Sequence, residues 1–336
     1  MQRIISYLLI ILFLPACMLE HRPCKVRFAG PTQGTYYEIT YFDQKGRSFQ
    51  EEIDSLLKMI DYSVSLWDKN SVISRVNRND TVVNLDEIFI ELFRMSEAIS
   101  EKTNGFFDIT VGPMVNAWGF GFTGRKKVDK KVIDSLLPLV SHHNISIKDN
   151  KMIKSDPAIQ IDFNAIAQGY SVDLIARFLE TKGIKNYLID IGGEVFARGE
   201  KPDGKNWVVG IESPAINKDD ERSLIAKISV RNMAVATSGS YRKYFEEDGI
   251  RYSHTIDPKT GYPVRHSLLS VTVLASDCAT ADAYATAFMV MGMEKSLDFI
   301  EQNKDLLNAY FIYSDRDGSY NTYGTTGIRE VISEWD

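Results

Sequence analysis

The chain has 336 residues, of which 44% are hydrophobic and 25% are charged, an ordinary composition for a globular protein with a core of useful size. Its net charge is −6 and it has no basic tail or Lys/Arg stripe, which argues against nucleic acid as a partner because phosphate contacts need clustered positive charge. No long linker, repeat or low-complexity run interrupts the sequence, so one continuous unit is predicted.

The N-terminus predicts an exported, lipid-anchored protein. Arg3 precedes an apolar stretch at 4–14 that is too short to span a bilayer comfortably and is typical of a signal peptide. This stretch runs into Leu-Pro-Ala-Cys, which resembles a bacterial lipobox ending at Cys17. Residues 1–16 are therefore predicted to be a lipoprotein signal peptide, with Cys17 as the lipidation site. The alternative is a plain cleaved signal followed by an incidental cysteine.

Two cysteines remain after the predicted lipidation site. Residues 17–28 are expected to tether the lipid to the fold, and residues 29–336 to form a single domain. Export permits a disulfide between Cys24 and Cys278. Cys278 lies among small residues, however, which favours a buried free thiol. No zinc site is predicted, because the sequence has no CxxC or HExxH pattern and its five histidines are scattered.

Strands and helices are interspersed along the chain. Short runs that alternate or are rich in β-branched residues predict strands at 36–42, 159–163, 187–191, 207–211, 225–230, 268–274 and 309–313. Apolar residues recurring every three or four positions predict helices at 51–66, 85–103, 170–182, 280–291 and 293–302. Many consecutive strands lack a helix between them. The pattern therefore predicts an α+β fold with mixed or antiparallel sheets and flanking helices, and not a doubly wound parallel sheet.

A segment rich in glycine and aromatic residues is the first candidate site. It reads TNGFFDITVGP at 103–113 and NAWGFG at 116–121. Aromatic residues separated by glycines can offer flat faces while the backbone approaches a ring system. The alternative is a loop whose aromatic side chains only pack on the core.

A strand-to-helix junction is the second candidate, at 162–173, where the sequence reads DFNAIAQGYSVD. We expect the strand to end near Phe163 and the helix to begin near Gly169. Such a junction offers unpaired backbone N–H and C=O groups, although it can also be an ordinary turn. The glycine pair at 192–193 and a loop expected at 237–240 can likewise either cradle a phosphate or serve only as turns.

A third segment, YSHTIDPKTGYP at 252–263, predicts a turn beside a histidine. Pro258 fixes φ and Gly261 takes the left-handed position, so the turn has a physical basis. His254 precedes it, and histidine is the side chain that ordinarily changes charge near neutral pH. The alternative is a surface or structurally bonded histidine.

The fourth segment, SDCATADAYAT at 276–286, predicts a helix capped by Asp277. Asp282 and Thr286 are four residues apart and share one face of this helix. A carboxylate and a hydroxyl are hard oxygen ligands, which suit Mg²⁺. The alternative is a solvated aspartate and a threonine bonded to its own helical turn.

In their residues and in their order along the chain, these four segments together resemble the ApbE family of flavin transferases. The similarity extends upstream through 33–35 and 65–77, and it includes 189–194 and 236–239 between the segments. It implies an α+β core related to the T-fold, with FAD and Mg²⁺ as ligands. It also implies transfer of the FMN half of FAD to a Thr or Ser hydroxyl of an acceptor protein, with release of AMP.

The resemblance also assigns roles to individual positions. His254 matches a histidine proposed to act at the acceptor hydroxyl. Asp282 and Thr286 match side chains that hold the metal, and Ala165 matches a position that contributes to the metal site. Contacts to the flavin nucleotide are matched by Gln33, Trp67, Ala117, Trp118, Gly119, Asp162, Gln168 and Ile256.

Three of these positions depart from the family pattern. Gln33 stands where methionine is usual, and Trp67 stands where tyrosine is common, a change that keeps a stacking face. Gln168 stands where lysine or glutamate is common, so it can still hydrogen-bond but supplies no charge. These departures concern individual contacts rather than the reaction.

The resemblance implies partners and a location. The expected acceptors are exported flavoprotein subunits of membrane electron-transfer complexes, such as sodium-pumping NADH:quinone reductases. The enzyme itself is expected to be anchored by lipid to a bacterial membrane and to face the periplasm. The chain lacks a Ser/Thr-Gly-Ala-Ser/Thr stretch, the acceptor pattern associated with the family, so it is expected to be the modifying enzyme.

Two other functions remain open on the sequence. One is hydrolysis of FAD to FMN and AMP, with water replacing the acceptor hydroxyl at the same residues. The other is a lipoprotein that binds FAD without catalysing a reaction. The presence of Asp282, Thr286 and His254 favours an enzyme over a storage protein, but it does not separate a transferase from a hydrolase.

Overall fold

The computed structural model describes residues 22–121, 128–214, 223–240, 244–247, 250–315 and 319–334, with only the backbone described at 244–247 and 250–252. The predicted signal peptide and Cys17 lie outside the described residues. The strands are β1 Cys24–Thr32, β2 Thr35–Asp43, β3 Ile145–Lys148, β4 Lys151–Lys154, β5 Tyr187–Ile191, β6 Glu194–Arg198, β7 Trp207–Glu212, β8 Leu224–Val230, β9 Met233–Gly239, β10 Tyr244–Glu247, β11 Ile250–Ser253, β12 Leu268–Ala275, β13 Asn308–Ser314, β14 Tyr320–Gly324 and β15 Ile332–Glu334. The helices are α1 Gln50–Val64, α2 Val72–Asn77, α3 Glu87–Lys102, α4 Gly112–Ala117, α5 Lys130–Leu136, α6 Ala167–Thr181, α7 Cys278–Met291, α8 Met293–Gln302 and α9 Thr326–Arg329, with 3-10 turns η1 Ile109–Val111, η2 Leu137–Leu139 and η3 His142–Asn144.

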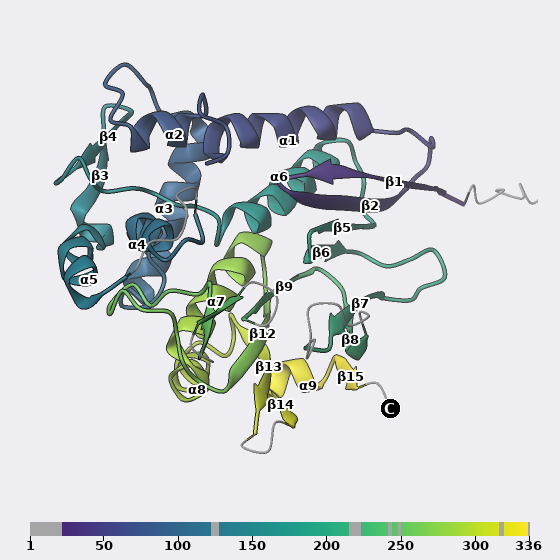
Figure 1. The fold of residues 1–336 in the computed structure, drawn as a ribbon. Helices are drawn as coiled ribbons and strands as arrows, with labels where there is room; N and C mark the ends of the chain where they lie inside the picture. The colour runs from purple at the N-terminus through teal and green to yellow at the C-terminus, as the bar shows by residue number, and fades with distance from the viewer. Residues whose placement is uncertain are drawn as a thin grey trace, which may run out of the picture.

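A large antiparallel sheet organises the fold. Among the described residues its strand order is β1-β2-β5-β6-β9-β12-β13-β14, and every neighbouring pair runs antiparallel. A smaller sheet has the order β15-β8-β7, and β3-β4 and β10-β11 form separate hairpins. Strands that are distant in sequence are therefore neighbours, as with β6 and β9 (Figure 1).

Each face of the large sheet covers its own hydrophobic core. On β13 the side chains of Ala309 and Phe311 belong to the core shared with the helices, and those of Tyr310 and Ile312 belong to a second core. This division follows from the two-residue period of a strand, which sends successive side chains to opposite faces. The second core also contains Trp207 of β7, so the small sheet covers the face opposite the helices.

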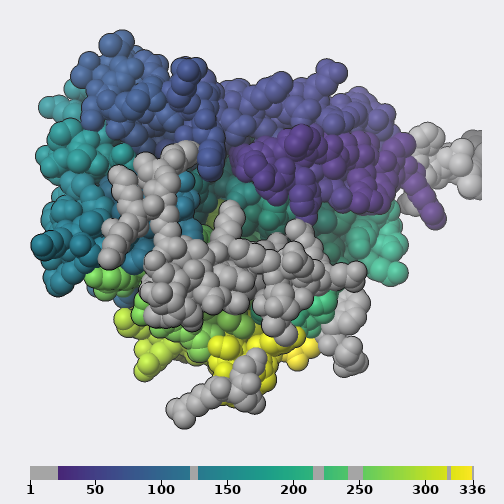
Figure 2. Space-filling view, in the orientation of Figure 1, coloured from purple at the N-terminus to yellow at the C-terminus, as the bar shows by residue number. Residues whose placement is uncertain are grey.

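The central helix of the first core is α7. It is buried along almost its whole length, unlike the amphipathic α1 and α3, which each keep one face in solvent. Its alanines permit close contact with α6 and with β9 and β12. In Figure 1 it lies in the middle of the molecule, and in Figure 2 the N-terminal strands, in purple, lie above the C-terminal elements, in yellow.

Most of the predicted elements are present with small changes at their ends, and the predicted α+β class is confirmed. The strand at 187–191 and the helix at 293–302 have the predicted boundaries. The predicted strand at 159–163 is wrong. Ile159, Ile161 and Phe163 are buried alternately, as in a strand, but no strand in the described part of the chain pairs with them. Instead the side chain of Asn77 exchanges two hydrogen bonds, of 2.8 and 2.9 Å, with the backbone of Ile161.

The prediction of a tether at 17–28 also needs correction. Strand β1 already begins at Cys24 and pairs with β2 along its whole length, from Cys24 opposite Asp43 to Thr32 opposite Thr35. Alternating partly buried side chains, Val26 and Phe28 among them, pack on the main core and hold this part of the chain to the sheet. Residues 24–28 therefore belong to the fold.

The cysteines of the described residues are free thiols. Cys278 is fully buried, which raises the pKa of its thiol, whereas Cys24 is exposed. The expectation of a buried free thiol at Cys278 is confirmed. Over the described part of the chain, no helix has the length and apolar character needed to cross a membrane.

Candidate functional site

The site begins where α6 and α7 touch. The backbone N–H of Gly169 in the first turn of α6 donates to Oδ2 of Asp282 on α7 at 3.1 Å. A side chain at Gly169 would collide with α7, because an added Cβ would lie 2.3 Å from the carbonyl oxygen of Cys278. Glycine is therefore required for this approach, which buries the carboxylate of Asp282 between the helices.

Two carboxylates lie close together at this contact. Asp173 of α6 accepts hydrogen bonds of 2.8 Å from the N–H groups of Cys278 and Ala279, at the first turn of α7. Burial raises the pKa of Asp173 to about 7. Burial also raises the pKa of Asp282 well above the ordinary range, and the charge of Asp173 adds to the effect. Both shifts mean that negative charge is costly here, and the charge of Arg177 offsets only part of that cost at Asp173.

The predicted cap of α7 is confirmed. The side chain of Asp277 accepts from the N–H of Thr280 at 2.9 Å. Together with Asp173, it satisfies three of the N–H groups that the start of a helix leaves without partners. The first turn of α7 is thereby fixed, and with it the direction of Asp282 one turn further on.

The hydroxyl of Thr286 lies one helical turn after Asp282. Its Oγ1 is 3.1 Å from Oγ of Ser238 on β9. Residues 237–239, expected in a loop, are part of this strand, and Thr237 pairs across the sheet with Thr272 through their hydroxyls at 2.8 Å. Ser238 therefore reaches the site from a rigid strand and not from a phosphate-cradling loop.

Ala165 lies in the turn before α6 and is half-buried. It precedes Ile166, the N-cap of α6, and the N–H of Gly169, the third residue of that helix, has no acceptor within the helix. Here that N–H donates to Asp282. Because Ala165 lies before the N-cap, its carbonyl oxygen takes no part in the hydrogen bonds within α6.

The donor chemistry fits a hard cation such as Mg²⁺. The available ligands are oxygens, from the carboxylate of Asp282, the hydroxyl of Thr286 and the carbonyl of Ala165. Among the described residues, no basic side chain forms an ion pair with Asp282 or Asp173. A divalent cation would supply the positive charge that these buried carboxylates lack.

Two of the predicted nucleotide contacts lie around the start of α6. Nε2 of Gln33 donates to Oγ of Ser171 at 2.8 Å, and its Oε1 is buried without a hydrogen-bond partner among the described residues. Nε2 of Gln168 lies against Gly192, where an added Cβ would be only 2.7 Å away. The turns β1-β2 and β5-β6 therefore meet α6, and an acceptor on Gln33 remains for a ligand.

Asp162 joins this region to the aromatic segment. Its N–H donates to the carbonyl of Ile109 at 2.7 Å, and its Oδ1 accepts from the N–H of Asn164 at 2.7 Å. Burial of its carboxyl group raises the pKa of Asp162. Nearby, the side chain of Asn116 donates to Gln160 at 2.7 Å, so the segments 109–116 and 160–163 lie side by side.

Trp118 is held against the turn that follows His254. Its Nε1–H donates to the carbonyl of Gly261 at 2.8 Å, and its ring packs with Met114, Ile133 and Ile256 in a small hydrophobic cluster. Its indole is only 7% exposed. Adjoining Trp118 are Ala117, which ends α4 and is also buried, and Gly119, which has φ +80°.

The turn at 257–261 has the predicted chemistry. The carbonyl of Asp257 accepts from the N–H of Gly261 at 2.8 Å, its side chain accepts from Lys259 and Thr260, and Gly261 has φ +74°. His254 is half-buried, and its ring centre lies 6.3 Å from that of Phe120. The histidine therefore lies between this turn and the aromatic segment.

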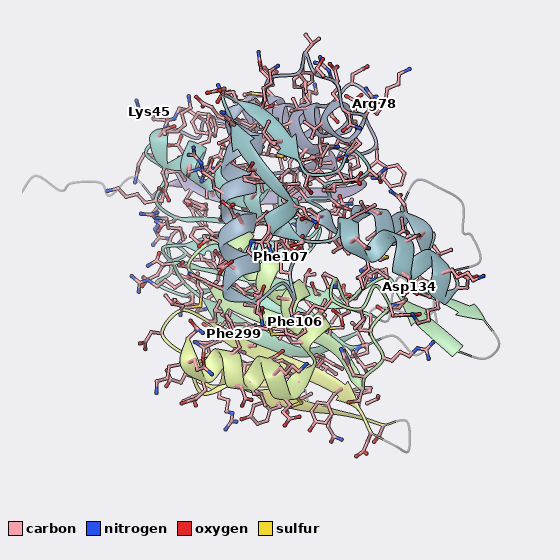
Figure 3. All side chains as sticks on the ribbon, turned by 90° about the vertical axis from the view of Figure 1, so that its left-hand side faces the viewer. Lys45, Arg78, Phe106, Phe107, Asp134 and Phe299 are labelled. Carbon is pink, nitrogen blue, oxygen red and sulfur yellow. The ribbon has the colours of Figure 1, made fainter. Side chains whose placement is uncertain are left out.

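The aromatic residues of the segment at 103–121 have separate surroundings. Phe107 is buried in the main core, while Phe106 is half-buried with the ammonium groups of Lys259 and Lys295 over its ring, at 4.4 and 4.9 Å from the ring centre. Both lie near the centre of the view in Figure 3. This contact brings the segment close to the turn after His254 and to α8.

Trp67 is the most exposed of the predicted contacts. It follows the end of α1 and its side chain is 78% exposed.

Sequence reasoning gave no role to Asp173, which links α6 to α7, or to Ser171, which holds Gln33. Both are polar residues buried in α6 among mostly apolar ones, and their polarity within this apolar run was visible in the sequence.

Two shallow hollows of about 240 and 300 Å³ are lined by other residues, around Trp207 and around Tyr323. The predicted residues form two groups. Gln33, Ala165, Gln168, Asp282 and Thr286 surround the α6–α7 contact, and Ala117, Trp118, Gly119, His254 and Ile256 surround the turn at 257–261.

Comparison with known proteins shows which family the chain resembles. The model of a family described as the ApbE family matches residues 33–311. The chain is 37% identical over 318 residues to a Vibrio cholerae protein named FAD:protein FMN transferase, covering 92% of this chain and 93% of that protein. It is 32% identical over 338 residues to the Escherichia coli protein of the same name, covering 96% and 95%.

Solved structures show the same fold. The flavin transferase ApbE from Vibrio cholerae superposes with a TM-score of 0.81 at 34% identity, covering 92% of this chain and 99% of that one. The apo form of the Pseudomonas stutzeri flavinyl transferase ApbE gives a TM-score of 0.80 at 33% identity, covering 94% and 98%.

Proposed function

This chain belongs to the ApbE family, and from that membership we propose that it transfers the FMN half of FAD, with Mg²⁺, to a Thr or Ser hydroxyl of acceptor proteins and releases AMP. Its relatives named FAD:protein FMN transferase match it over nearly their full length, so the chain is an enzyme of that type. One observation carries the metal requirement: a carboxylate on α7, Asp282, is buried beside a second carboxylate with a hydroxyl one turn away.

The residues around the α6–α7 contact would hold the metal and the pyrophosphate of FAD. When bound, Mg²⁺ offsets the negative charge of the two phosphates and of the departing AMP oxygen. Asp282, Thr286 and the carbonyl of Ala165 would hold the ion. The Oε1 of Gln33, which has no partner among the described residues, would accept a hydrogen bond from the nucleotide. The hydrogen bond from Gln33 to Ser171 holds this side chain beside the start of α6.

His254 accepts the proton of the attacking hydroxyl. It is half-buried between Phe120 and the rigid turn at 257–261, which fixes its place relative to Trp118. A positioned base of this kind usually accelerates proton transfer by about 10²–10⁴-fold. We expect the metal to contribute more than the base, because stabilisation of developing charge is usually the larger effect.

The acceptors are proposed to be exported flavoprotein subunits of membrane electron-transfer complexes, and the enzyme to be anchored by lipid at Cys17 on the periplasmic side of a bacterial membrane. The basis is the leader at 1–16, which ends in a lipobox-like sequence. Cys17→Ala should leave a chain without lipid that moves from the membrane fraction to the soluble fraction. Unchanged retention in the membrane would contradict the proposed anchor.

The reaction is tested by incubating the protein with FAD, Mg²⁺ and a candidate acceptor domain, and then measuring flavin fluorescence on the acceptor in a denaturing gel. Asp282→Ala should nearly abolish labelling, and excess Mg²⁺ should restore only part of it. The matched control is Asp298→Ala, which removes an exposed carboxylate from the adjacent helix α8 and should label normally. Wild-type Mg²⁺ dependence in Asp282→Ala would overturn the metal assignment. Release of FMN and AMP with no labelled acceptor would instead identify a hydrolase.

A further inference from the structure

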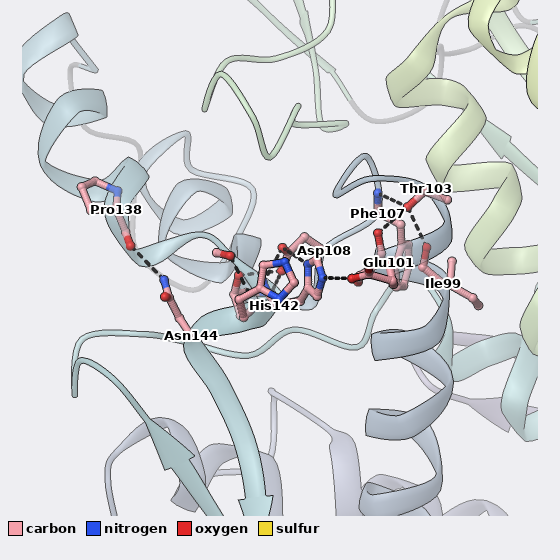
Figure 4. A network of polar contacts seen from close by, with 12 residues as sticks. Ile99, Glu101, Thr103, Phe107, Asp108, Pro138, His142 and Asn144 are labelled. Atoms are coloured by element: carbon pink, nitrogen blue, oxygen red, sulfur yellow. Dashed lines mark hydrogen bonds and ion pairs between the residues drawn. The ribbon is translucent and has the colours of Figure 1, made fainter.

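A second group of potential metal ligands lies away from the α6–α7 contact, at the C-terminal end of α3. Glu101 in the last turn of α3 faces the short turn η3, which begins His142-His143. One ligand atom from each of these three residues lies within 4.8 Å of the other two. The three side chains come from segments about forty residues apart, so it is the fold that places them together. Figure 4 shows Glu101 beside His142.

His142 is oriented like a metal-binding histidine. Its Nε2 is 3.2 Å from Oε2 of Glu101, while its Nδ1 is 3.5 Å from Oδ2 of Asp108 on the other side of the ring. Asp108 is buried, and its two oxygens accept hydrogen bonds from Thr110 and from the N–H of His142. Histidines that bind metal usually have such a carboxylate behind the ring, which fixes the tautomer and turns the other nitrogen toward the ion.

We propose that Glu101, His142 and His143 form a binding site for Zn²⁺ or a similar borderline transition-metal cation, separate from the Mg²⁺ site. Two imidazoles and one carboxylate are ligands that zinc uses in proteins, and imidazole is a poor ligand for Mg²⁺. Three protein ligands leave a fourth position for water. The site therefore differs in ligand chemistry from the all-oxygen group around Asp282.

The distances suit a tetrahedral ion after small side-chain rotations. Ligands about 2.0–2.1 Å from zinc lie about 3.4 Å from one another. Nε2 of His142 and Oε2 of Glu101 already have nearly this spacing, at 3.2 Å. His143 and Glu101 are exposed and free to rotate toward the ion, whereas His142 is buried, with its backbone N–H bonded to Asp108 and its Nδ1 3.5 Å from the same carboxylate. The rings of the two histidines have their centres 3.9 Å apart.

The position of Glu101 adds an electrostatic argument. A carboxylate in the last turn of a helix faces the negative end of the helix dipole, where a cation is preferred. A bound cation would satisfy both the carboxylate and the C-terminal end of α3. Because the ion would join α3 to η3, it would stabilise the segment 103–121 that lies between them in sequence and carries Trp118.

Zinc binding to the purified full chain tests the proposal, by competition with a chromophoric zinc chelator in excess Mg²⁺. The wild type should bind one Zn²⁺ that His143→Ala and Glu101→Gln lose or bind at least about tenfold more weakly, since even loss of an outer partner costs metal sites 10–100-fold. Zn²⁺ should also raise the melting temperature of the wild type but not of His143→Ala. Both replaced side chains are exposed, so the variants should melt like the wild type without zinc.

Two controls separate this site from others. Glu97→Gln changes an exposed carboxylate one turn earlier on α3 and should bind zinc as the wild type does. Asp282→Ala should also keep its zinc, whatever happens to FMN transfer. Equal zinc affinity in the wild type, His143→Ala and Glu101→Gln would overturn the proposal, as would zinc binding that is lost only in Asp282→Ala.

Discussion

Replacing Gly169 with alanine tests the close approach of α6 and α7, on which the position of Asp282 depends. The added Cβ would lie 2.3 Å from the carbonyl oxygen of Cys278 and 2.8 Å from Cα of Ala279, both backbone atoms of α7. No side chain can rotate away, so the helices must separate by about 1 Å to restore an ordinary contact. The hydrogen bond from Gly169 to Asp282, now 3.1 Å, would lengthen with them.

The expected cost follows from these contacts. Overpacking a core costs about 1–3 kcal/mol, and the upper part of that range applies because the obstacle is backbone. Alanine returns up to about 1 kcal/mol through its higher helix propensity. We expect the free energy of unfolding to fall by about 1–2 kcal/mol. Transfer should fall further, by about 10²-fold, because a displacement near 1 Å at a reacting site has that effect.

Urea unfolding and FMN transfer are measured on the same Gly169→Ala preparation. The control is Gly210→Ala on β7, where the nearest atoms to an added Cβ are the methyl ends of the exposed Leu224 side chain, which can move. That variant should unfold and transfer like the wild type. A wild-type urea midpoint together with wild-type transfer in Gly169→Ala would refute the claim that the helices are in contact there.

Three further predictions concern the base, the flavin contact and acid stability. His254→Ala should lower transfer by about 10²–10⁴-fold with unchanged Mg²⁺ dependence, and raising the pH from about 6 to 9 should recover part of the rate; a wild-type rate would make this histidine only part of its turn. Trp67→Phe should reduce the loss of tryptophan fluorescence on adding FAD, and a titration curve equal to that of the wild type would count against Trp67 as a contact. Hydrogen bonds from Arg47 lower the pKa of Asp43 to about 2, so this pair stabilises the fold above pH 4 and loses its effect as the pH falls toward 2. Asp43→Asn should therefore lower the free energy of unfolding by about 1 kcal/mol at pH 7, a modest amount because solvent screens the Arg47 end of the pair. The loss should become progressively smaller below pH 4. A constant difference between the urea midpoints of the variant and the wild type across this pH range would contradict the assignment.

The secondary structure was predictable from the sequence where one periodicity dominates. The helix at 293–302 and the strand at 187–191 have one buried face each, so their boundaries follow from the pattern of apolar residues. The segment 159–163 has the alternation of a strand and its buried side chains, but whether a strand forms depends on a partner. Asn77, more than eighty residues earlier, provides hydrogen bonds in place of one.

The candidate site was predictable as separate segments but not as an arrangement. A capped helix with Asp282 and Thr286 on one face follows from local rules, and Asp277 does cap it. The approach of Gly169 to that face depends on packing between distant helices, which one sequence does not specify. The pairing of His142 with Glu101 is equally non-local, since histidines scattered in sequence become neighbours only through the fold.

If Cys17 carries lipid, as proposed, the early start of β1 would limit how far the catalytic domain reaches from the membrane. With lipid on Cys17, as proposed, only residues 18–23 separate the acyl chains from Cys24, the first residue of the sheet. Even a fully extended chain over that interval spans at most about 25 Å. The catalytic domain would then be joined to the membrane by a short linker, with its β1 edge toward the lipid headgroups. Acceptor hydroxyls would have to be presented within about one domain diameter of the bilayer surface, which favours membrane-bound acceptors over freely diffusing ones.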